Sequence, residues 1–299
     1  MPELPDIELY LHALTSRIVG QPIEAVRLSS PFLLRSIEPP VNALIGRRVL
    51  SLRRLGKRLV WALEGDLFVV IHLMIAGRFR WKERGAAIPA KVGLAAFDFP
   101  NGTLLMTEAG SKRQASLYFV GSERALNAHD PGGVEPLQIS LDEFTRALRR
   151  ENHTVKRALT DPHLFSGIGN AYSDEILHAA MMSPMKQTMQ MSAEEIESLF
   201  DATVVTLQRW RDRLLDETGD DFPEKVTAFR EGMAVHGRYG KPCPVCGTPV
   251  QRIRYAANEA NYCPTCQTGG KLLADRSLSR LLKGDWPRTL EELERRMRR

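Results

Sequence analysis

The chain has 299 residues, of which 43% are hydrophobic, and a formal net charge of +5 at pH 7. This length allows two or three domains with packed cores, and the basic balance is a modest indication of a polyanionic partner. The longest apolar run, 67–76, is too short to span a membrane as a helix, which takes roughly 20 residues. Because no signal pattern begins the chain, we expect a cytoplasmic protein without membrane segments.

The first residues, Met1-Pro2-Glu3-Leu4-Pro5, bring two reactive groups together. Trimming of Met1 before the small Pro2 would leave a secondary α-amine, which titrates near about pH 8. Such an amine can attack a sugar C1′ and form an iminium ion, and Glu3 could serve as an acid or base. A merely processed chain end is the more common explanation of a second-position proline, and both explanations stay open on these residues alone.

Residues 5–19 predict a helix, because apolar residues recur there at spacings of three and four. Gly20 is placed to end it. A helix at this position would hold the chain rigidly behind Pro2 and Glu3, as a terminal nucleophile requires.

Residues 23–120 predict an antiparallel β-sandwich or barrel, because strand-like runs follow one another closely with little helix between them. The runs are 23–28, 49–55, 59–63, 67–73, 78–81, 94–99, 103–107 and 116–120. Asn101-Gly102 indicates a hairpin turn between two of them.

Lys57 follows Gly56 between two of these predicted strands, inside a basic stretch. It could belong to a solvated strand edge that opposes aggregation, or to a strip that binds phosphates. The sequence of this stretch does not decide between the two.

The linker-like 130–133 precedes a change to helical periodicity, with predicted helices at 141–150, 153–160, 171–180 and 192–217. A Ser-Ala-Glu-Glu capping box opens the last of these helices. Between the second and third helices, a glycine-rich turn ends at Asn170. Such a turn and the helix N-terminus behind it can bind a phosphate, although a simple tight turn is more common.

The four cysteines of the chain, Cys243, Cys246, Cys263 and Cys266, have the spacing C-x2-C-x16-C-x2-C. In a reducing compartment this spacing predicts one zinc ion held by four thiolates, and a filled tetrahedral shell makes that ion structural. Turn and strand formers between the two pairs predict a β-hairpin with one cysteine pair at each end.

Four separated features together resemble the formamidopyrimidine-DNA glycosylase/endonuclease VIII family of DNA repair enzymes. They are the Pro-Glu-Leu-Pro start, Lys57, the segment 167–175 (Gly-Ile-Gly-Asn-Ala-Tyr-Ser-Asp-Glu), and the zinc finger introduced by 236–240 (His-Gly-Arg-Tyr-Gly). The resemblance covers nearly the full length of the chain. It implies an α+β fold, with an N-terminal helix plus antiparallel β-sandwich, a helix-two-turn-helix domain and a C-terminal zinc finger, and with DNA held in a cleft between domains.

The resemblance also implies an activity: a bifunctional DNA glycosylase and abasic-site lyase of base excision repair that removes oxidised bases and cleaves by β,δ-elimination. Pro2 would be the nucleophile at C1′ and Glu3 the proton donor during sugar ring opening. Lys57 and Asn170 would bind phosphates beside the lesion, and Glu175 would help to hold the N-terminal site. The implied partner is damaged DNA, and we expect a monomer, nucleoid-associated if the protein is bacterial.

The chain departs from the familiar family pattern at the residues that replace the flipped base. The usual Asp-Pro-Arg-Arg-Phe-Gly loop is absent, and 108–114, which includes Lys112 and Arg113, stands in its place. Ile75 occupies the position of the usual methionine, so the wedge that enters the DNA would be Ile75 or Met74. Residues 219–233 are too short for the long loop associated with 8-oxoguanine, which leads us to expect weak excision of that base.

In the zinc finger, Asn258 takes the place of the usual hairpin arginine, and a neutral amide gives up the bidentate charged contact with a phosphate. Arg252, Arg254 or Lys271 could compensate. Because the wedge and finger differ, a lesion-binding protein without catalysis and an abasic-site lyase with poor base excision are the alternatives.

The predicted domains are 1–130 (catalytic sandwich), 131–235 (helix-two-turn-helix), 236–275 (zinc finger) and 276–299 (basic tail, with an amphipathic helix over 289–299). The remaining histidines have no metal-like spacing, and we expect them at the surface or in satisfied core positions: His12, His129, His153, His163 and His178.

Overall fold

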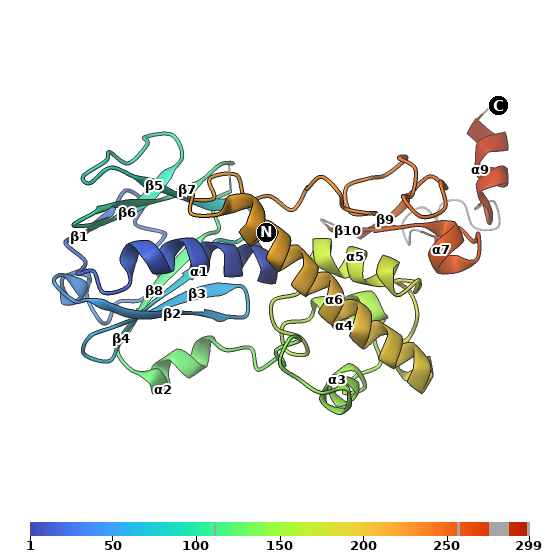
Figure 1. Ribbon diagram of the computed structural model, residues 1–299, viewed down its shortest axis with the longest axis horizontal. Helices are drawn as coiled ribbons and strands as arrows, with labels where there is room; N and C mark the ends of the chain where they lie inside the picture. Colours follow the sequence, from blue (N-terminus) through green and yellow to red (C-terminus); the bar gives the residue numbers. More distant parts are fainter. Residues whose placement is uncertain (111, 256–257, 275–286, 298–299) are drawn as a thin grey trace. The chain divides into compact units, whose positions relative to one another are not determined.

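The computed structural model describes residues 1–110, 112–255, 258–274 and 287–297 (Figure 1). The chain divides into two compact units. Unit 1 comprises residues 1–133 and 208–228, and unit 2 comprises residues 134–207 and 229–299. Within the described ranges, none of the helices combines the length and the apolar character that crossing a membrane requires.

Unit 1 contains two four-stranded antiparallel sheets, which confirms the predicted sandwich. One sheet has the order β1-β6-β7-β5, with bounds Ala25–Leu28, Gly93–Phe99, Gly102–Glu108 and Gly77–Lys82. The other has the order β2-β3-β4-β8, with bounds Val49–Leu55, Arg58–Leu63, Leu67–His72 and Ser116–Val120. The short helices of this unit are η1 (Val41–Leu44), α2 (Glu123–Leu126) and η2 (Asn127–His129).

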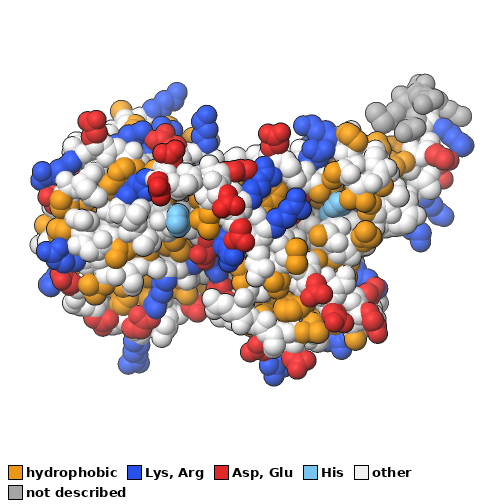
Figure 2. All heavy atoms as spheres, in the orientation of Figure 1, with side chains coloured by type: hydrophobic (Ala, Val, Ile, Leu, Met, Phe, Trp, Pro, Cys, Tyr) orange, Lys and Arg blue, Asp and Glu red, His pale blue; other side chains and the backbone are white. Residues whose placement is uncertain are grey.

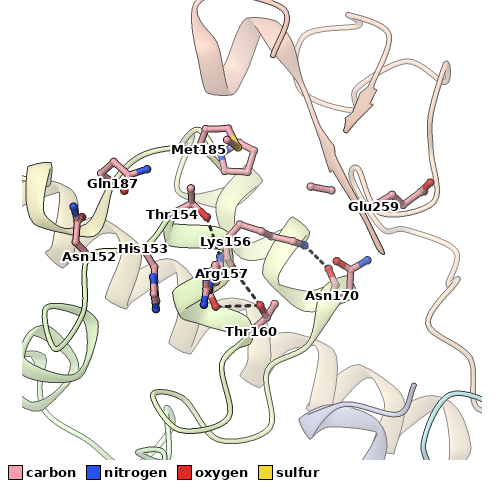
Figure 3. A pocket seen from close by; sticks show the side chains of 12 residues that line it. Asn152, His153, Thr154, Lys156, Arg157, Thr160, Asn170, Met185, Gln187 and Glu259 are labelled. Atoms are coloured by element: carbon pink, nitrogen blue, oxygen red, sulfur yellow. Dashed lines mark hydrogen bonds between the residues drawn. The ribbon is translucent and has the colours of Figure 1, made fainter. Parts of the chain in front are cut away.

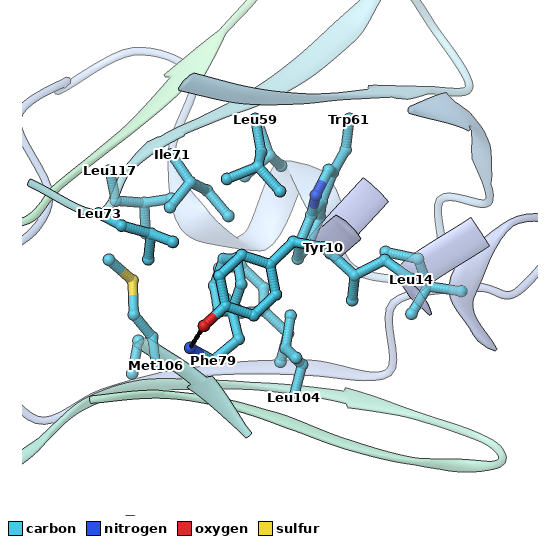
Figure 4. Packing of buried hydrophobic residues seen from close by; sticks show 14 of the residues in the cluster. Tyr10, Leu14, Leu59, Trp61, Ile71, Leu73, Phe79, Leu104, Met106 and Leu117 are labelled. Carbon is cyan, nitrogen blue, oxygen red and sulfur yellow. Dashed lines mark hydrogen bonds between the residues drawn. The ribbon is translucent and has the colours of Figure 1, made fainter. Parts of the chain in front are cut away.

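Helix α1 (Leu4–Ile18) lies in the core of this sandwich, and its apolar residues meet side chains from both sheets (Figure 4). Tyr10 packs edge-on against Phe79, with ring centroids 5.2 Å apart, and its hydroxyl accepts the backbone N–H of Phe79 at 3.4 Å. Trp61 packs edge-on against Phe97 of the facing sheet. Burial of large side chains on several faces of α1 fixes the start of the helix, and with it the N-terminal residues.

The hairpin between β6 and β7 is present, but its turn lies one residue earlier than the sequence pattern predicted. Phe99 pairs with Gly102, so Pro100 and Asn101 form the turn and Gly102 belongs to the strand. A Cβ atom on Gly102 would approach the Trp81 ring to 2.4 Å. Glycine is therefore required here by the close approach of an aromatic ring and not by the turn.

Unit 2 contains the helices α3 (Leu141–Leu148), α4 (Val155–Thr160) and α5 (Asn170–Ala179), the short η3 (Thr188–Gln190), and part of the long α6 (Ala193–Thr218). Phe144 is in ring contact with both Phe165 and Phe200 in the helical core. The predicted capping box of α6 is confirmed, because Ser192 and Glu195 each accept the other's backbone N–H.

The zinc-finger segment of unit 2 forms a hairpin of β9 (Gln251–Tyr255) and β10 (Asn258–Tyr262), followed by α7 (Pro264–Thr268). The cysteine pairs flank this hairpin, one before β9 and one after β10, as predicted. Helix α9 (Leu290–Met297) lies within the predicted C-terminal helix. Residues 276–286 and 298–299 of the predicted basic tail lie outside the described residues.

Candidate active site and nucleic-acid interface

The N-terminal residues are fixed by the capping of α1. Glu3 is the N-cap residue, and its backbone N–H donates to Asp6 Oδ2 at 2.9 Å. Pro5 stands in the first turn, where its missing N–H costs no helical hydrogen bond. Pro2 and Glu3 are both buried. The two predicted catalytic residues therefore occupy an ordered position at a helix start.

The surroundings of the N-terminus favour a neutral amine. Burial lowers the pKa of the Met1 α-amine; Glu3 and Asp6 oppose this effect, while Arg78 and Lys57 add to it. Removal of Met1 would transfer the free amine to Pro2, which is the more buried of the two residues. The same burial would then act on a secondary amine, and a neutral amine is the nucleophilic form.

Lys57 belongs to the two-residue turn between β2 and β3, where Gly56 has φ +61°. Arg54 ties this turn to α1. Its Nη1 donates to the Gly56 carbonyl at 2.9 Å, and its Nε lies 3.0 Å from Glu8 Oε1. The Arg54 side chain is only 8% exposed, and its two contacts, to Gly56 and to Glu8, hold the Lys57 backbone relative to the helix behind Pro2.

His72 is a candidate site residue that was not predicted from the sequence. It ends β4 directly opposite Arg58, and its buried Nε2 has no hydrogen-bond partner among the described residues. Burial, and then the charges of Arg58 and Lys57, lower the pKa of His72 to about 4. The imidazole is therefore neutral near pH 7. A histidine inside the apolar run 67–76 was the only sequence signal.

The connection from β4 to β5 presents Ile75, one of the two predicted wedge residues. Ile75 is 63% exposed, whereas Met74 is half-buried and has φ +52°. A Cβ on Gly77 would lie 2.2 Å from the Leu73 carbonyl oxygen, so the turn closes tightly against its own start. An exposed isoleucine on a tight turn fits a wedge better than the half-buried methionine.

The segment that replaces the usual wedge loop is organised by a buried carboxylate. Glu108 accepts the backbone N–H groups of Gln114 and Ala115 at 3.0 and 3.1 Å. Lys112 and Arg113 are exposed between these anchors, and Arg113 donates to the Lys91 carbonyl at 2.8 Å. Ser111 lies outside the described residues. The two predicted DNA-contacting cations are therefore held on a short loop.

In unit 2, Asn170 is the first residue of α5 and lines a pocket of about 500 Å³ (Figure 3). Lys156 extends along the same pocket, where its Nζ donates to the Asn170 carbonyl and to Ser173 Oγ, both at 2.8 Å. Gly167, with φ +79°, turns the chain just before this helix. The glycine-rich turn thus presents a helix N-terminus, an arrangement suited to an anion. The charge of Lys156 is already paired with Asp174, at 2.5 Å.

Two adjacent carboxylates on α5 hold the segment that leads into the zinc finger. Glu175 accepts the backbone N–H groups of Ala234, Val235 and His236 at 2.7–2.9 Å. Asp174 contacts the His236 ring at 2.8 Å. In unit 2 the buried Glu175 therefore has a structural task, and its predicted support of the N-terminal site stays a prediction.

The four cysteines converge as the spacing predicted. Their sulfur atoms all lie within 4.8 Å of one another, with Sγ–Sγ distances of 3.9 Å for Cys243 and Cys266 and 3.4 Å for Cys246 and Cys263. Tetrahedral thiolates around zinc stand about 3.8 Å apart, given a Zn–S distance of about 2.3 Å. The donor set and its spacing therefore fit one structural zinc ion.

The matching family models cover most of the chain in three pieces. They are the formamidopyrimidine-DNA glycosylase N-terminal domain at residues 1–113, the H2TH domain of the same enzymes at 133–210, and the zinc finger found in FPG and IleRS at 240–269. Among curated relatives, formamidopyrimidine-DNA glycosylase of Heliobacterium modesticaldum is 33% identical over 282 residues, which is 89% of this chain and 100% of the relative. The chain belongs to the formamidopyrimidine-DNA glycosylase family.

Other members of the formamidopyrimidine-DNA glycosylase family show the same correspondence. The Thermus thermophilus enzyme is 33% identical over 279 residues, and a formamidopyrimidine-DNA glycosylase-like protein of Mycobacterium tuberculosis is 41% identical over half of this chain. The structure of a Lactococcus lactis Fpg mutant with Fapy-dG-containing DNA has a TM-score of 0.78 at 26% identity, covering 89% of this chain and all of that one. The predicted family, fold class and structural zinc are confirmed.

This family member departs from the usual finger as the sequence indicated. Asn258 begins β10, and its side chain lies outside the described part of the structure. Of the residues that could compensate, Arg252 is already engaged: its guanidinium lies over the Tyr239 ring, 4.2 Å from the centroid. Arg254 and Lys271 are exposed.

Surface charge alone does not locate the DNA interface of this glycosylase. On the face shown in Figure 2, Lys and Arg side chains are interspersed with Asp and Glu. The candidate DNA-binding residues are therefore identified one by one, chiefly Lys57 and His72 in unit 1 and Asn170 in unit 2.

Proposed function

We propose that this protein excises damaged bases from DNA and then cleaves the abasic site, using the Pro2 amine as the nucleophile. The observation that carries the proposal is the placement of Pro2: buried, at the capped start of α1, next to Glu3. The solved relatives support DNA as the substrate, since they are complexes with DNA containing Fapy-dG, an abasic site or carbocyclic 8-oxo-G.

The chemistry follows from a neutral secondary amine. After removal of Met1, the Pro2 nitrogen attacks C1′ and the damaged base leaves with the electrons of the glycosidic bond. Glu3 protonates the sugar ring oxygen, so the ring opens to an iminium ion. The iminium ion draws electrons from C2′ and thereby acidifies the C2′ proton. Loss of the C2′ proton expels the 3′ phosphate, and a second elimination expels the 5′ phosphate.

The DNA phosphates would be bound by hydrogen-bond donors that the fold already holds in place. Lys57 is held by the Arg54-anchored turn, and the neutral His72 can donate or accept beside it. In unit 2, Asn170 stands at the N-terminus of α5. A phosphate at a helix N-terminus gains from unsatisfied backbone N–H groups and from the helix dipole.

We further propose that 8-oxoguanine is a poor substrate. The support comes from the segment 219–233, which would have to cap that base. Phe222 packs near Tyr10 and Trp81 at centroid distances of 6.1 and 6.5 Å, and Glu224 pairs with Lys82 at 2.6 Å. Because Phe222 and Glu224 are packed or paired against unit 1, few residues of this segment are free to close over a flipped purine.

The test is a cleavage assay on end-labelled duplexes that contain one abasic site, one oxidised pyrimidine, one ring-opened purine or one 8-oxoguanine. The proposal predicts 3′-phosphate and 5′-phosphate ends on all but the 8-oxoguanine duplex, which should be cut at least about tenfold more slowly. Cleavage of the abasic duplex alone would leave a lyase with poor base excision. Comparable rates on 8-oxoguanine and the best pyrimidine would overturn the proposed preference.

A further inference from the structure

His178, on the last turn of α5, contacts the zinc finger directly. Its Nε2 lies 3.2 Å from the sulfur of Cys243, and both residues are buried, at 7% and 3% exposure. The two residues are 65 positions apart in the chain, so no local sequence pattern indicates the contact. The contact belongs to neither the proposed catalytic residues nor the phosphate-binding residues.

A second, independent contact joins the same end of α5 to the other cysteine pair. Gln267 Nε2 donates to the Met182 carbonyl at 2.9 Å, and Gln267 Oε1 accepts the backbone N–H of Cys263 at 2.8 Å. Met182 lies just beyond the C-terminal end of α5, which is Ala179. Both cysteine pairs are therefore bonded to one stretch of chain, residues 178–182.

The charge of a loaded finger explains why such a donor would matter. Four thiolates around one divalent ion leave a net negative charge, and burial of that charge costs free energy unless hydrogen bonds disperse it. Cys243 is buried, at 3% exposure, and His178 Nε2 lies within hydrogen-bond distance of its sulfur. At the other buried cysteine, Cys263, a backbone N–H approaches the sulfur only at the long distance of 3.5 Å. An imidazole N–H at 3.2 Å from Cys243 supplies a donor on the helix side.

We propose that His178 donates its Nε2–H to the Cys243 thiolate of the zinc-loaded finger and thereby links zinc binding to α5. This is a positioning role: His178 touches neither the substrate nor the reacting atoms. Because α5 begins at Asn170, the same helix has the zinc site at one end and the candidate phosphate site at the other. Loss of the donor should weaken zinc binding even where the fold is kept.

The test compares zinc release from whole zinc-loaded proteins challenged with a chromogenic chelator. His178→Phe keeps a planar ring but removes the donor, His178→Gln keeps an N–H donor, and His163→Phe repeats the substitution at an exposed position of unit 2. Loss of a partner hydrogen-bonded to a metal ligand typically lowers metal affinity about 10–100-fold. We expect a loss of that size for His178→Phe, a smaller loss for His178→Gln, and wild-type behaviour for His163→Phe. Zinc affinity of His178→Phe within about twofold of wild type would overturn the proposal.

A measurement on the unmutated protein covers the case in which His178→Phe does not fold. In protein loaded with ¹¹³Cd in place of zinc, an N–H···S bond transmits a scalar coupling between the His178 Nε2 proton and the metal. Detection of that coupling supports the proposal. A His178 ring protonated only at Nδ1, or an Nε2 proton without coupling, contradicts it whatever the activity of the enzyme.

Discussion

Asp174 is the residue whose replacement should most affect the stability of unit 2. Its carboxylate is 1% exposed and bonds Lys156 Nζ at 2.5 Å through one oxygen, and His236 Nδ1 at 2.8 Å and Asn261 Nδ2 at 3.2 Å through the other. One side chain thus joins α4, α5, the start of the finger and β10. Lys156 is itself only 12% exposed, so water replaces the lost charge poorly.

Asp174→Asn keeps the shape of the side chain and removes its charge. The new amide NH₂ group must then face a hydrogen-bond donor that the carboxylate oxygen had paired with, so that contact is lost. Removal of one partner from a buried ion pair costs about 3–5 kcal/mol. At about 2–4 °C per kcal/mol, the melting temperature of the zinc-loaded protein should fall by roughly 10 °C. Asp201→Asn, an exposed aspartate of α6 with the same charge change, is the matched control and should shift it little.

The assay is urea unfolding of zinc-loaded wild type, Asp174→Asn, Lys156→Met and the double variant. Because the two side chains share one buried contact, the double variant should lose at least about 1 kcal/mol less than the sum of the single losses. If the free energies of unfolding of Asp174→Asn and Asp201→Asn differ by less than about 0.5 kcal/mol, the buried network around Asp174 does not stabilise unit 2.

Five further outcomes follow from the structure. Gly102→Ala should cost about 1–3 kcal/mol in urea unfolding, because its Cβ would meet the Trp81 ring; unchanged stability would mean that the ring moves aside freely. His72→Leu should weaken binding of abasic DNA about tenfold, whereas His72→Gln should retain most of it, as measured by fluorescence anisotropy. Because the pKa of His72 is about 4, that binding should show no His72-dependent change between about pH 6 and pH 8. The abasic-site cleavage rate should instead rise with pH as the Pro2 amine loses its proton. Burial lowers the pKa of the Met1 α-amine, and the same burial acting on Pro2 should place the midpoint below about 8; a midpoint above it would show that burial does not favour the neutral amine. Zinc removal by a chelator should expose the Cys263 segment to hydrogen exchange while the β-sandwich amides stay protected.

The sequence predicted those features that are encoded by short-range patterns. The apolar spacing over 5–19 located α1, which is Leu4–Ile18, and the Ser192 capping box located the start of α6. The cysteine spacing predicted the zinc cluster, because ligand geometry restricts which spacings can close around one ion. The limits of the β-sandwich strands were right to within one residue, apart from β1, which starts two residues later than predicted, at Ala25.

The sequence did not predict contacts between residues that are distant along the chain. Gly102 was assigned to a turn because nothing nearby in the sequence reports the Trp81 ring. His178 was assigned no function because its partner sulfur lies in the finger. His72 acquires its lowered pKa from burial and from Arg58 on a neighbouring strand. Each of these depends on tertiary packing, which local pattern does not encode.

The most direct test of the central claim is borohydride trapping with identification of the linked residue. Mature protein, with Met1 shown to be absent by mass spectrometry, is incubated with a duplex that contains one abasic site and is then reduced. We predict a covalent complex whose linked peptide begins at Pro2. The Pro2→Gly variant should form such a link more slowly than wild type, and a form that retains Met1 should not form it. Tight DNA binding without a trapped complex, or a link that maps to Lys57, would contradict catalysis by the N-terminal proline.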